Sequence, residues 1–225
     1  MIEFPHISKG RSKPFLDITN LMIKKYIRDL RNYNDPVFQN VEKFAKEINY
    51  PIIDYVTGHL ISVLVNLGRH KNIFEMGSGF GYSALWFAKG MSGNGKITLT
   101  DIYCDYLTMA KSNLSKQYPL LTINTFCGDT IQTLEQSEEN YDCIFIDIGD
   151  KSLYPKAGKI ALEKTSVNGM IIADNVLWRG KVVESEPDKQ TKSINIFNEQ
   201  MMAVDNFDTI ILPVGDGLLV SIKKY

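Results

Sequence analysis

The sequence predicts an α/β fold, a doubly wound and mostly parallel sheet with an antiparallel C-terminal edge strand and an N-terminal helical cap. From residue 73 onward, short apolar runs alternate with segments whose apolar side chains recur at helical spacing. The runs are apolar at consecutive positions, which is typical of strands that helices cover on both faces. Hydrophobic residues make up 44% of the chain and charged residues 23%, so disordered, collagenous and low-complexity classes are excluded.

Three helix-like segments precede the first strand. In the first, from Ile18 to Leu30, apolar side chains recur at helical spacing. The second begins at Asp35-Pro36, where a capping residue is followed by a proline suited to the first helical position. The third follows Pro51 and stops at Gly68, a residue common at helix ends. Residues 1–16 are expected to form an irregular basic arm.

The rest of the chain supplies the sheet and its covering helices. Strands are expected at residues 73–76, 96–100, 121–127, 141–146 and 169–173, with helices over residues 82–89, 105–116 and 154–163. A helix over about residues 191–204 and two strands, around 209–212 and 218–223, complete the chain. The segment Pro213-Val214-Gly215-Asp216-Gly217 between the last two strands is hairpin-like, with Asp216 as a turn residue. We therefore expect one antiparallel edge on a parallel sheet.

Length and charge restrict the organisation and the partners. The 225 residues fit one domain, with residues 1–50 as the helical cap and residues 51–225 as a Rossmann-like core. The net charge of -1 argues against non-specific binding of nucleic acid. No apolar run approaches the roughly 18 residues that cross a bilayer, and no secretory signal opens the sequence. A soluble, cytoplasmic protein without a membrane partner is expected.

The three cysteines do not form a metal-binding or redox motif. Cys104, Cys127 and Cys143 lack the CxxC spacing of such sites. We expect them to be small, buried and reduced side chains, with no disulfide between them.

Polar residues follow the expected strands at the points where the strands end. Glu75 ends the first, Asp101 the second, Asp129 follows the third, Asp147 the fourth, and Asp174-Asn175 the fifth. In open α/β sheets, ligands bind beyond the carboxyl ends of the strands at the topological switch point. Each of these side chains alone could equally cap a helix. Together they favour a functional site.

A glycine-rich turn follows the first strand. Gly77-Ser78-Gly79-Phe80-Gly81 lets the backbone approach a ligand closely, and the helix behind it favours an anion. Its GxGxG spacing differs from the GxGxxG of the dinucleotide fingerprint. Asp101 lies 20 residues after Gly81, a suitable place for an acid that binds a ribose diol. The turn can serve NAD or S-adenosylmethionine, and the spacing favours S-adenosylmethionine.

Four segments carry a family resemblance over about residues 50–225. Phe74–Leu85 resembles the first motif of the class I O-methyltransferases that depend on S-adenosylmethionine and on a metal, of the catechol and caffeoyl-CoA type, and the chain looks like a bacterial member. Tyr141–Asp147 resembles the fourth strand of that family. Asp174–Val182 reproduces its DNVLWRGKV signature, and Leu212–Leu218 also matches.

The resemblance implies which residues bind the cofactor. Gly77, Gly79, Gly81 and Ser83 would hold the methionine part of S-adenosylmethionine, and Asp101 would bind its ribose. Asp129, with Gly128 and Thr130, would lie beside the adenine. Glu75 and Asp147 are also expected to bind the cofactor, although Glu75 could instead form a hydrogen bond with the backbone near the glycine turn.

The resemblance also implies a metal site and a base. Asp147, Asp174 and Asn175 would bind Mg²⁺, or alternatively Ca²⁺, for which hard oxygen ligands are suited. Such an ion would lower the pKa of an acceptor hydroxyl and hold its oxygen near the methyl group. Trp178 would form a wall of the acceptor pocket. Lys151 would be the general base, with Asp147 also catalytic.

One departure from the family pattern affects the base. The family reads Asp-Ala-Asp-Lys, whereas Asp147-Ile148-Gly149-Asp150-Lys151 holds one residue more. The extra residue leaves open whether Lys151 or another group is the base, and whether Asp150 faces the metal region.

The function expected is methyl transfer to a hydroxyl oxygen of a small catechol-like or hydroxycinnamoyl-type acceptor, by a homodimer. A first alternative is O-methylation of the wobble 5-hydroxyuridine of tRNA, suggested by the basic N-terminal arm and by the basic cluster Lys24, Lys25, Arg28 and Arg31 of the first expected helix. Two others are an NAD-dependent oxidoreductase, which the glycine spacing opposes, and a cofactor-binding protein without catalytic activity.

Overall fold

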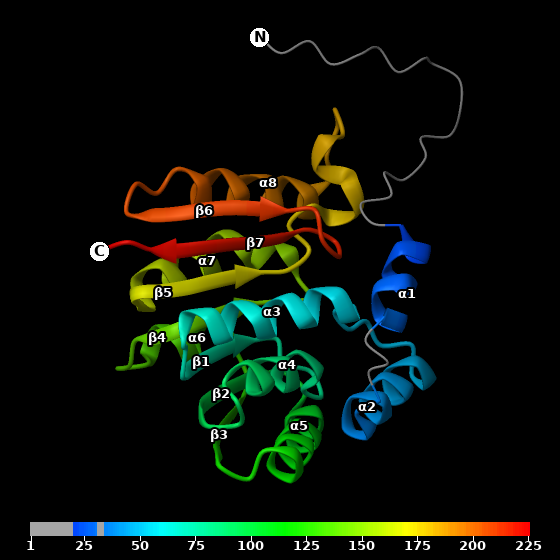
Figure 1. Cartoon of the computed structure of the whole chain (residues 1–225). Helices are drawn as coiled ribbons and strands as arrows, with labels where there is room; N and C mark the ends of the chain where they lie inside the picture. The colour runs from blue at the N-terminus through cyan, green and yellow to red at the C-terminus, as the bar shows by residue number, and fades with distance from the viewer. Residues whose placement is uncertain (1–19, 31–33) are drawn as a thin grey trace.

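The computed structural model describes residues 20–30 and 34–225. The expected basic arm, the start of the first expected helix and Arg31 lie outside the described residues. Within them, a seven-stranded sheet has the order β3-β2-β1-β4-β5-β7-β6 (Figure 1). Its strands are β1 (Asn72–Met76), β2 (Gly95–Asp101), β3 (Leu121–Cys127), β4 (Tyr141–Ile146), β5 (Thr165–Ala173), β6 (Phe207–Leu212) and β7 (Leu218–Lys223).

The predicted sheet topology is confirmed. Strands β1 to β5 pair in parallel, and the order reverses between β1 and β4, which is the switch point of a doubly wound sheet. The antiparallel strand at the C-terminal edge is β7, which pairs with β5 on one side and with β6 on the other. The first four residues of strand β7 are buried, whereas Asp208 and Ile210 of β6 are exposed, which fits the outermost position of β6. The turn of the hairpin between β6 and β7 lies at the end of the sheet where the carboxyl ends of β4 and β5 lie.

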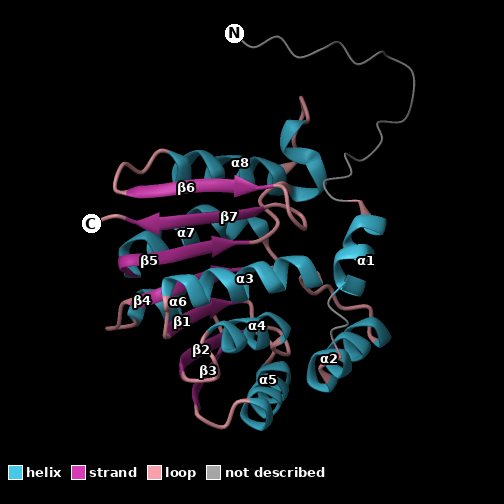
Figure 2. Cartoon of the chain, in the orientation of Figure 1, coloured by secondary structure: helices cyan, strands magenta, loops and turns pink. Residues whose placement is uncertain are grey.

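Helices cover both faces of the sheet (Figure 2). Helices α3 (Tyr55–Gly68), α4 (Tyr82–Gly90) and α5 (Cys104–Gln117) lie on one face, and α6 (Thr130–Gln136), α7 (Tyr154–Lys164) and α8 (Lys189–Met202) on the other. Each face has its own apolar core, around Trp86 on the first and around Tyr154 and Phe197 on the second. Two short 3-10 helices, η1 (Lys151–Leu153) and η2 (Trp178–Val183), lie in loops at the carboxyl ends of the strands. No described helix is both long and apolar enough to cross a bilayer.

The two N-terminal helices attach to the first face in different ways. Helix α2 (Pro36–Glu47) buries Phe38, whose ring packs edge-to-face against Trp86 of α4. Helix α1 (Leu21–Leu30) buries no residue. It is held by ion pairs, Lys24 with Asp54 at 2.6 Å and Arg28 with Glu42. The charged side of α1 therefore faces the body of the protein.

The expectation of three reduced cysteines is wrong for one pair. Cys104 at the start of α5 and Cys127 at the end of β3 form a disulfide, with their Cα atoms 5.2 Å apart. The parallel register places Asp101 opposite Cys127, so the chain that leaves β2 passes directly over the end of β3. Sequence spacing does not reveal this register. Cys143 is free and buried, as expected.

Candidate active site

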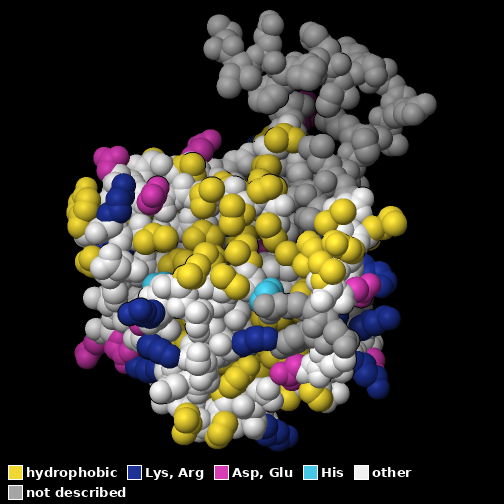
Figure 3. Space-filling view, in the orientation of Figure 1, with side chains coloured by type: hydrophobic (Ala, Val, Ile, Leu, Met, Phe, Trp, Pro, Cys, Tyr) yellow, Lys and Arg dark blue, Asp and Glu magenta, His cyan; other side chains and the backbone are white. Residues whose placement is uncertain are grey.

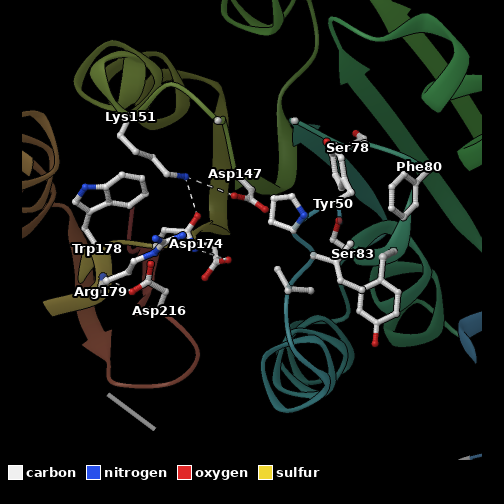
Figure 4. Close-up of a pocket in the computed structure, with 18 residues that line it drawn as sticks. Tyr50, Ser78, Phe80, Ser83, Asp147, Lys151, Asp174, Trp178, Arg179 and Asp216 are labelled. Atoms are coloured by element: carbon white, nitrogen blue, oxygen red, sulfur yellow. Dashed lines mark hydrogen bonds and ion pairs between the residues drawn. The ribbon is translucent and has the colours of Figure 1, made fainter. Parts of the chain in front are cut away.

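The carboxyl ends of β1, β4 and β5 surround a cavity of about 270 Å³ (Figure 4). Eight of the residues expected in the site line it: Gly77, Gly79, Ser83, Asp147, Lys151, Asp174, Asn175 and Trp178. Several other lining residues were not expected in the site, chiefly Tyr50, Ile53, Arg179 and Asp216, of which Asp216 was expected only in the turn of the hairpin. Of the expected residues, Glu75, Gly81, Asp101, Gly128, Asp129 and Thr130 are not part of the lining.

The glycine turn forms one wall of the cavity. Gly77 has a φ of +87°, and a Cβ atom there would lie 2.2 Å from the backbone oxygen of Asp147. Only glycine therefore lets β1 and β4 approach so closely at this point. The backbone N–H of Gly79 donates a hydrogen bond to Asp101 Oδ2 at 2.8 Å. Asp101 thus fixes the turn from behind.

Gly81 serves packing and not the cavity wall. A Cβ atom at Gly81 would lie 2.8 Å from the Cβ of Ala110 in α5. Helix α4 begins directly after Gly81, and its first residues, Tyr82 and Ser83, reach the cavity. The positive end of the helix dipole thus points toward the place where a ligand would lie.

Glu75 lies beneath the turn with its side chain fully buried. Its Oε1 accepts a hydrogen bond from the Ser83 hydroxyl, while Oε2 has no hydrogen-bond partner. Burial raises the pKa of Glu75 to about 8, although the hydrogen bond from Ser83 opposes this shift. Glu75 therefore touches the cavity wall through Ser83 and does not line the cavity itself.

The segment after β3 lies beyond the cavity lining. Asp129 caps α6 by accepting hydrogen bonds from the N–H groups of Ile131 at 2.8 Å and Gln132 at 3.1 Å. Thr130 is buried and forms a hydrogen bond with Thr100. A role of Gly128, Asp129 and Thr130 beside an adenine remains a prediction.

Opposite the glycine turn, one lysine lies among the acids that end β4 and β5. The Lys151 side chain is almost fully buried, and its Nζ donates to Asn175 Oδ1 at 2.8 Å, Tyr154 Oη at 2.8 Å and the backbone oxygen of Ile148 at 2.9 Å. The Nζ also lies 3.6 Å from Asp147 Oδ1. Burial lowers the pKa of Lys151, while the charges of Asp147 and Asp174 oppose the shift. The lysine is thus held by four fixed partners.

The two acids of this cluster also titrate abnormally. Burial raises the pKa of Asp174, and the nearby charge of Asp147 raises it further. Burial likewise raises the pKa of Asp147, which the Lys151 ammonium partly offsets. Asp174 Oδ1 is buried with no hydrogen-bond partner.

The extra residue in the loop after β4 does not displace the lysine. Gly149 lines the cavity, and the chain then turns outward so that Asp150 is exposed. Asp150 caps η1 through the Ser152 N–H at 3.0 Å and accepts a hydrogen bond from Gln190 at 2.9 Å. Asp150 therefore faces away from the acidic cluster, and Lys151 returns to it.

Trp178 and Tyr50 lie at opposite sides of the cavity (Figure 4). The Trp178 ring faces the Lys151 Nζ, 5.7 Å from the ring centre, and its indole N–H has no hydrogen-bond partner. Tyr50 packs against Gly79, and burial, followed by the charges of Asp101 and Asp147, raises the pKa of Tyr50 to about 12. Tyr50 comes from the connection between α2 and α3, where no sequence motif marked it.

This chain resembles known proteins in both sequence and fold. A family model described as O-methyltransferase matches residues 30–224. Catechol O-methyltransferase of Niastella koreensis is 28% identical over 210 residues, which cover 90% of this chain and 92% of the relative. Caffeoyl-CoA O-methyltransferase 3 of Nicotiana tabacum is 30% identical over 174 residues, which cover 72% of each chain. The crystal structure of the O-methyltransferase from Bacillus cereus in complex with SAH superposes with a TM-score of 0.79 at 26% identity, covering 90% of this chain and 97% of that chain.

Proposed function

Because this chain belongs to the O-methyltransferase family, we propose that it transfers the methyl group of S-adenosylmethionine to a hydroxyl oxygen of a small catechol-like or hydroxycinnamoyl-type acceptor, assisted by a divalent cation. The observation that carries the proposal is the cavity in which Asp147, Lys151 and Asp174 face the glycine turn. One side of the cavity suits an amino-acid-bearing cofactor, and the other suits an acidic hydroxyl.

The glycine turn and the start of α4 support the cofactor assignment. Gly77 and Gly79 line the cavity, so a ligand there can reach their backbone atoms. The N-terminus of α4 favours the carboxylate of the methionine part. The relative from Bacillus cereus, with the same fold, was crystallised with SAH.

The acids at the ends of β4 and β5 fit a divalent cation. Asp147, Asp174 and Asn175 offer oxygen ligands, which Mg²⁺ and Ca²⁺ prefer. Asp174 Oδ1, buried and without a partner, is an oxygen that a cation would satisfy. Among the described residues, no three His, Cys, Asp or Glu side chains form a metal site by themselves, so the amide of Asn175 would complete the set. When bound, the ion would lower the pKa of an acceptor hydroxyl.

Lys151 is the proposed base. Burial lowers the pKa of Lys151, which makes loss of a proton from its ammonium easier, and the neutral amine so formed can accept the proton of an acceptor hydroxyl. The oxygen then attacks the methyl carbon, the carbon–sulfur bond breaks, and neutral S-adenosylhomocysteine leaves. Tyr154 and the backbone oxygen of Ile148 hold the lysine for this step. Trp178 shields the lysine from water on the acceptor side.

The test is methyl transfer to catechol and to caffeate, measured with and without EDTA. EDTA should abolish turnover, and added Mg²⁺ should restore it. Calorimetric titration with Mg²⁺ should detect binding to the native chain but not to Asp174→Asn. Asp150→Asn is the matched control, because Asp150 is exposed and turned away, and it should bind Mg²⁺ as the native chain does. Undiminished turnover of catechol in EDTA would reject the role of the cation.

The structure gives less support to the tRNA alternative. Lys24 and Arg28 are paired with Asp54 and Glu42, and Lys25 is paired with Asp29 on its own helix. Their positive charge is thus largely balanced within the chain, which leaves little for phosphate groups.

The homodimer is part of the proposal. The face of α1 opposite its ion pairs exposes Met22 by 80%, Tyr26 by 62% and Leu30 by 67%. Figure 3 shows hydrophobic side chains gathered over this helix. A continuous apolar face of this kind is typical of protein–protein contacts. Sedimentation equilibrium of the native chain and of Met22→Glu/Tyr26→Glu should give a dimer and a monomer, respectively.

A further inference from the structure

The loop after β5 is held in an unusual backbone conformation. Asn175, Trp178 and Arg179 have φ values of +60°, +44° and +55°. Asparagine adopts this left-handed region more readily than most residues, but for Trp178 and Arg179 it costs about 1 kcal/mol or more each. Two such residues in succession persist only if neighbouring structure fixes them. That neighbouring structure is the hairpin between β6 and β7.

The hairpin holds the loop through three hydrogen bonds. The N–H of Val176 donates to the backbone oxygen of Gly217 at 3.1 Å, and the N–H of Leu177 donates to that of Asp216 at 3.0 Å. The third comes from the N–H of Arg179 to Asp216 Oδ1. Gly217, with a φ of +88°, permits this approach, because a Cβ there would lie 2.4 Å from the Leu177 side chain.

The Asp216 carboxylate is the only one of these acceptors that a side-chain substitution can remove. It is half-buried and lines the cavity beside Asp174 and Arg179. It binds the backbone of Arg179, directly after Trp178, so it fixes both residues at their left-handed positions. Without it, the last part of the loop is free to relax toward ordinary φ values, and the Trp178 ring would leave its place opposite Lys151.

We propose that Asp216 is a positioning residue, whose carboxylate holds Trp178 and Arg179 against the cavity and thereby sets the affinity for the acceptor. The part of this inference that concerns acceptor affinity rests on the proposed function. The part that concerns the position of Trp178 is independent of that function, because the position can be measured without any substrate.

The substrate-free test uses acrylamide quenching of tryptophan fluorescence. The chain has two tryptophans, and Trp86 is fully buried, so the quenchable emission belongs to Trp178. Trp178→Phe should remove that component and confirm the assignment. Asp216→Ala should raise the quenching constant at least about twofold, because the ring becomes more exposed. Asp216→Asn keeps an oxygen acceptor for the Arg179 N–H and should quench as the native chain does.

The kinetic test separates the acceptor from the cofactor. Asp216→Ala should raise KM for catechol about tenfold, as expected if the loop is held in place by one hydrogen bond to a charged carboxylate. KM for S-adenosylmethionine should change less than about twofold. Asp216→Asn should restore most of the acceptor affinity. If Asp216→Ala does not fold, Asp216→Ser, which keeps a shorter oxygen acceptor, replaces it, with intermediate values expected.

Two results would overturn the inference. One is unchanged quenching in a folded Asp216→Ala, and the other is an asparagine variant as impaired as the alanine variant. If no acceptor is turned over but quenching changes as expected, the proposed function fails while the positioning role of Asp216 stands.

Discussion

Replacing Glu75 by glutamine should raise the free energy of unfolding of the protein at pH 8 and should change it little at pH 4.5. The Glu75 carboxyl is fully buried beneath the glycine turn, and one of its oxygens has no hydrogen-bond partner. Burial therefore penalises the charged form and raises the pKa of Glu75 to about 8. Glutamine is always neutral and can still accept the hydrogen bond from Ser83.

The sign and size of the effect follow from proton linkage. Below its ordinary pKa of 4.5, Glu75 is protonated in both the folded and the unfolded chain, and no penalty arises. As pH rises from 4.5 to about 8, the unfolded chain loses this proton first, so the native protein loses stability relative to the variant. At about 1.4 kcal/mol per pH unit, the difference approaches about 5 kcal/mol. For a chain of this size it corresponds to a difference in Tm of roughly 10 °C or more.

The measurement is the free energy of unfolding in urea at several pH values from 4.5 to 8.5, for the native chain and for Glu75→Gln. The informative quantity is how their difference changes with pH, since titration of the remaining groups largely cancels in it. Glu139→Gln is the control, because a hydrogen bond from Lys96 lowers the pKa of Glu139, so the folded and the unfolded chain have both lost this proton above about pH 5 and the difference for this variant should stay nearly flat up to pH 8.5. A Glu75→Gln difference that stays flat from pH 4.5 to 8.5 would refute the burial argument.

Three further changes have expected outcomes. Lys151→Gln should lower kcat about a hundredfold or more, as for the loss of a general base, while calorimetry finds binding of S-adenosylhomocysteine little changed; a kcat near the native value would exclude Lys151 as the base. Gly77→Ala places a Cβ against the backbone oxygen of Asp147 and should lower both Tm and cofactor affinity; a native Tm would contradict the close approach. Cys104→Ser opens the disulfide to Cys127 and should lower the free energy of unfolding by about 3 kcal/mol, the loop-entropy value for a separation of 23 residues. Dithiothreitol should reproduce that loss in the native chain, and no change with either treatment would argue against the disulfide.

The parts of the fold predicted from the sequence are those with a strong local signal. The consecutive apolar residues of β4 indicate a strand covered on both faces, and the structure has it at the expected residues. Helix α6 was missed because seven residues give too little helical periodicity, even though Asp129 caps it. The sequence predicts β5 over residues 169–173, whereas the strand starts at Thr165. Its first part is polar and pairs with β4 across a shift in register, which an apolar pattern does not detect.

One topological rule accounts for the part of the candidate site that the sequence predicts. Parallel strands end at the same edge, so Asp147 and Asp174 had to lie near the glycine turn once β1, β4 and β5 were recognised. Asp216 follows a different rule, because it reaches the site only if the C-terminal hairpin lies next to β5. Its sequence context, a turn between two strands, is the same wherever the hairpin lies. Tyr50 was missed for a similar reason, since packing and not a motif brings it to Gly79.

The charges in the cavity explain why these acids titrate abnormally. Asp147, Asp174 and Asp216 bring three carboxyl groups to one cavity, where Lys151 is buried and Arg179 lies exposed at the edge. Burial raises the pKa of all three acids, and neighbouring acids raise that of Asp174 further, so the lysine does not fully compensate for them. A cavity with an excess of buried carboxylates is stabilised by a ligand that carries positive charge. Both a sulfonium cofactor and a divalent cation bring that charge, and therefore the electrostatics favour the same two ligands that the family resemblance implies.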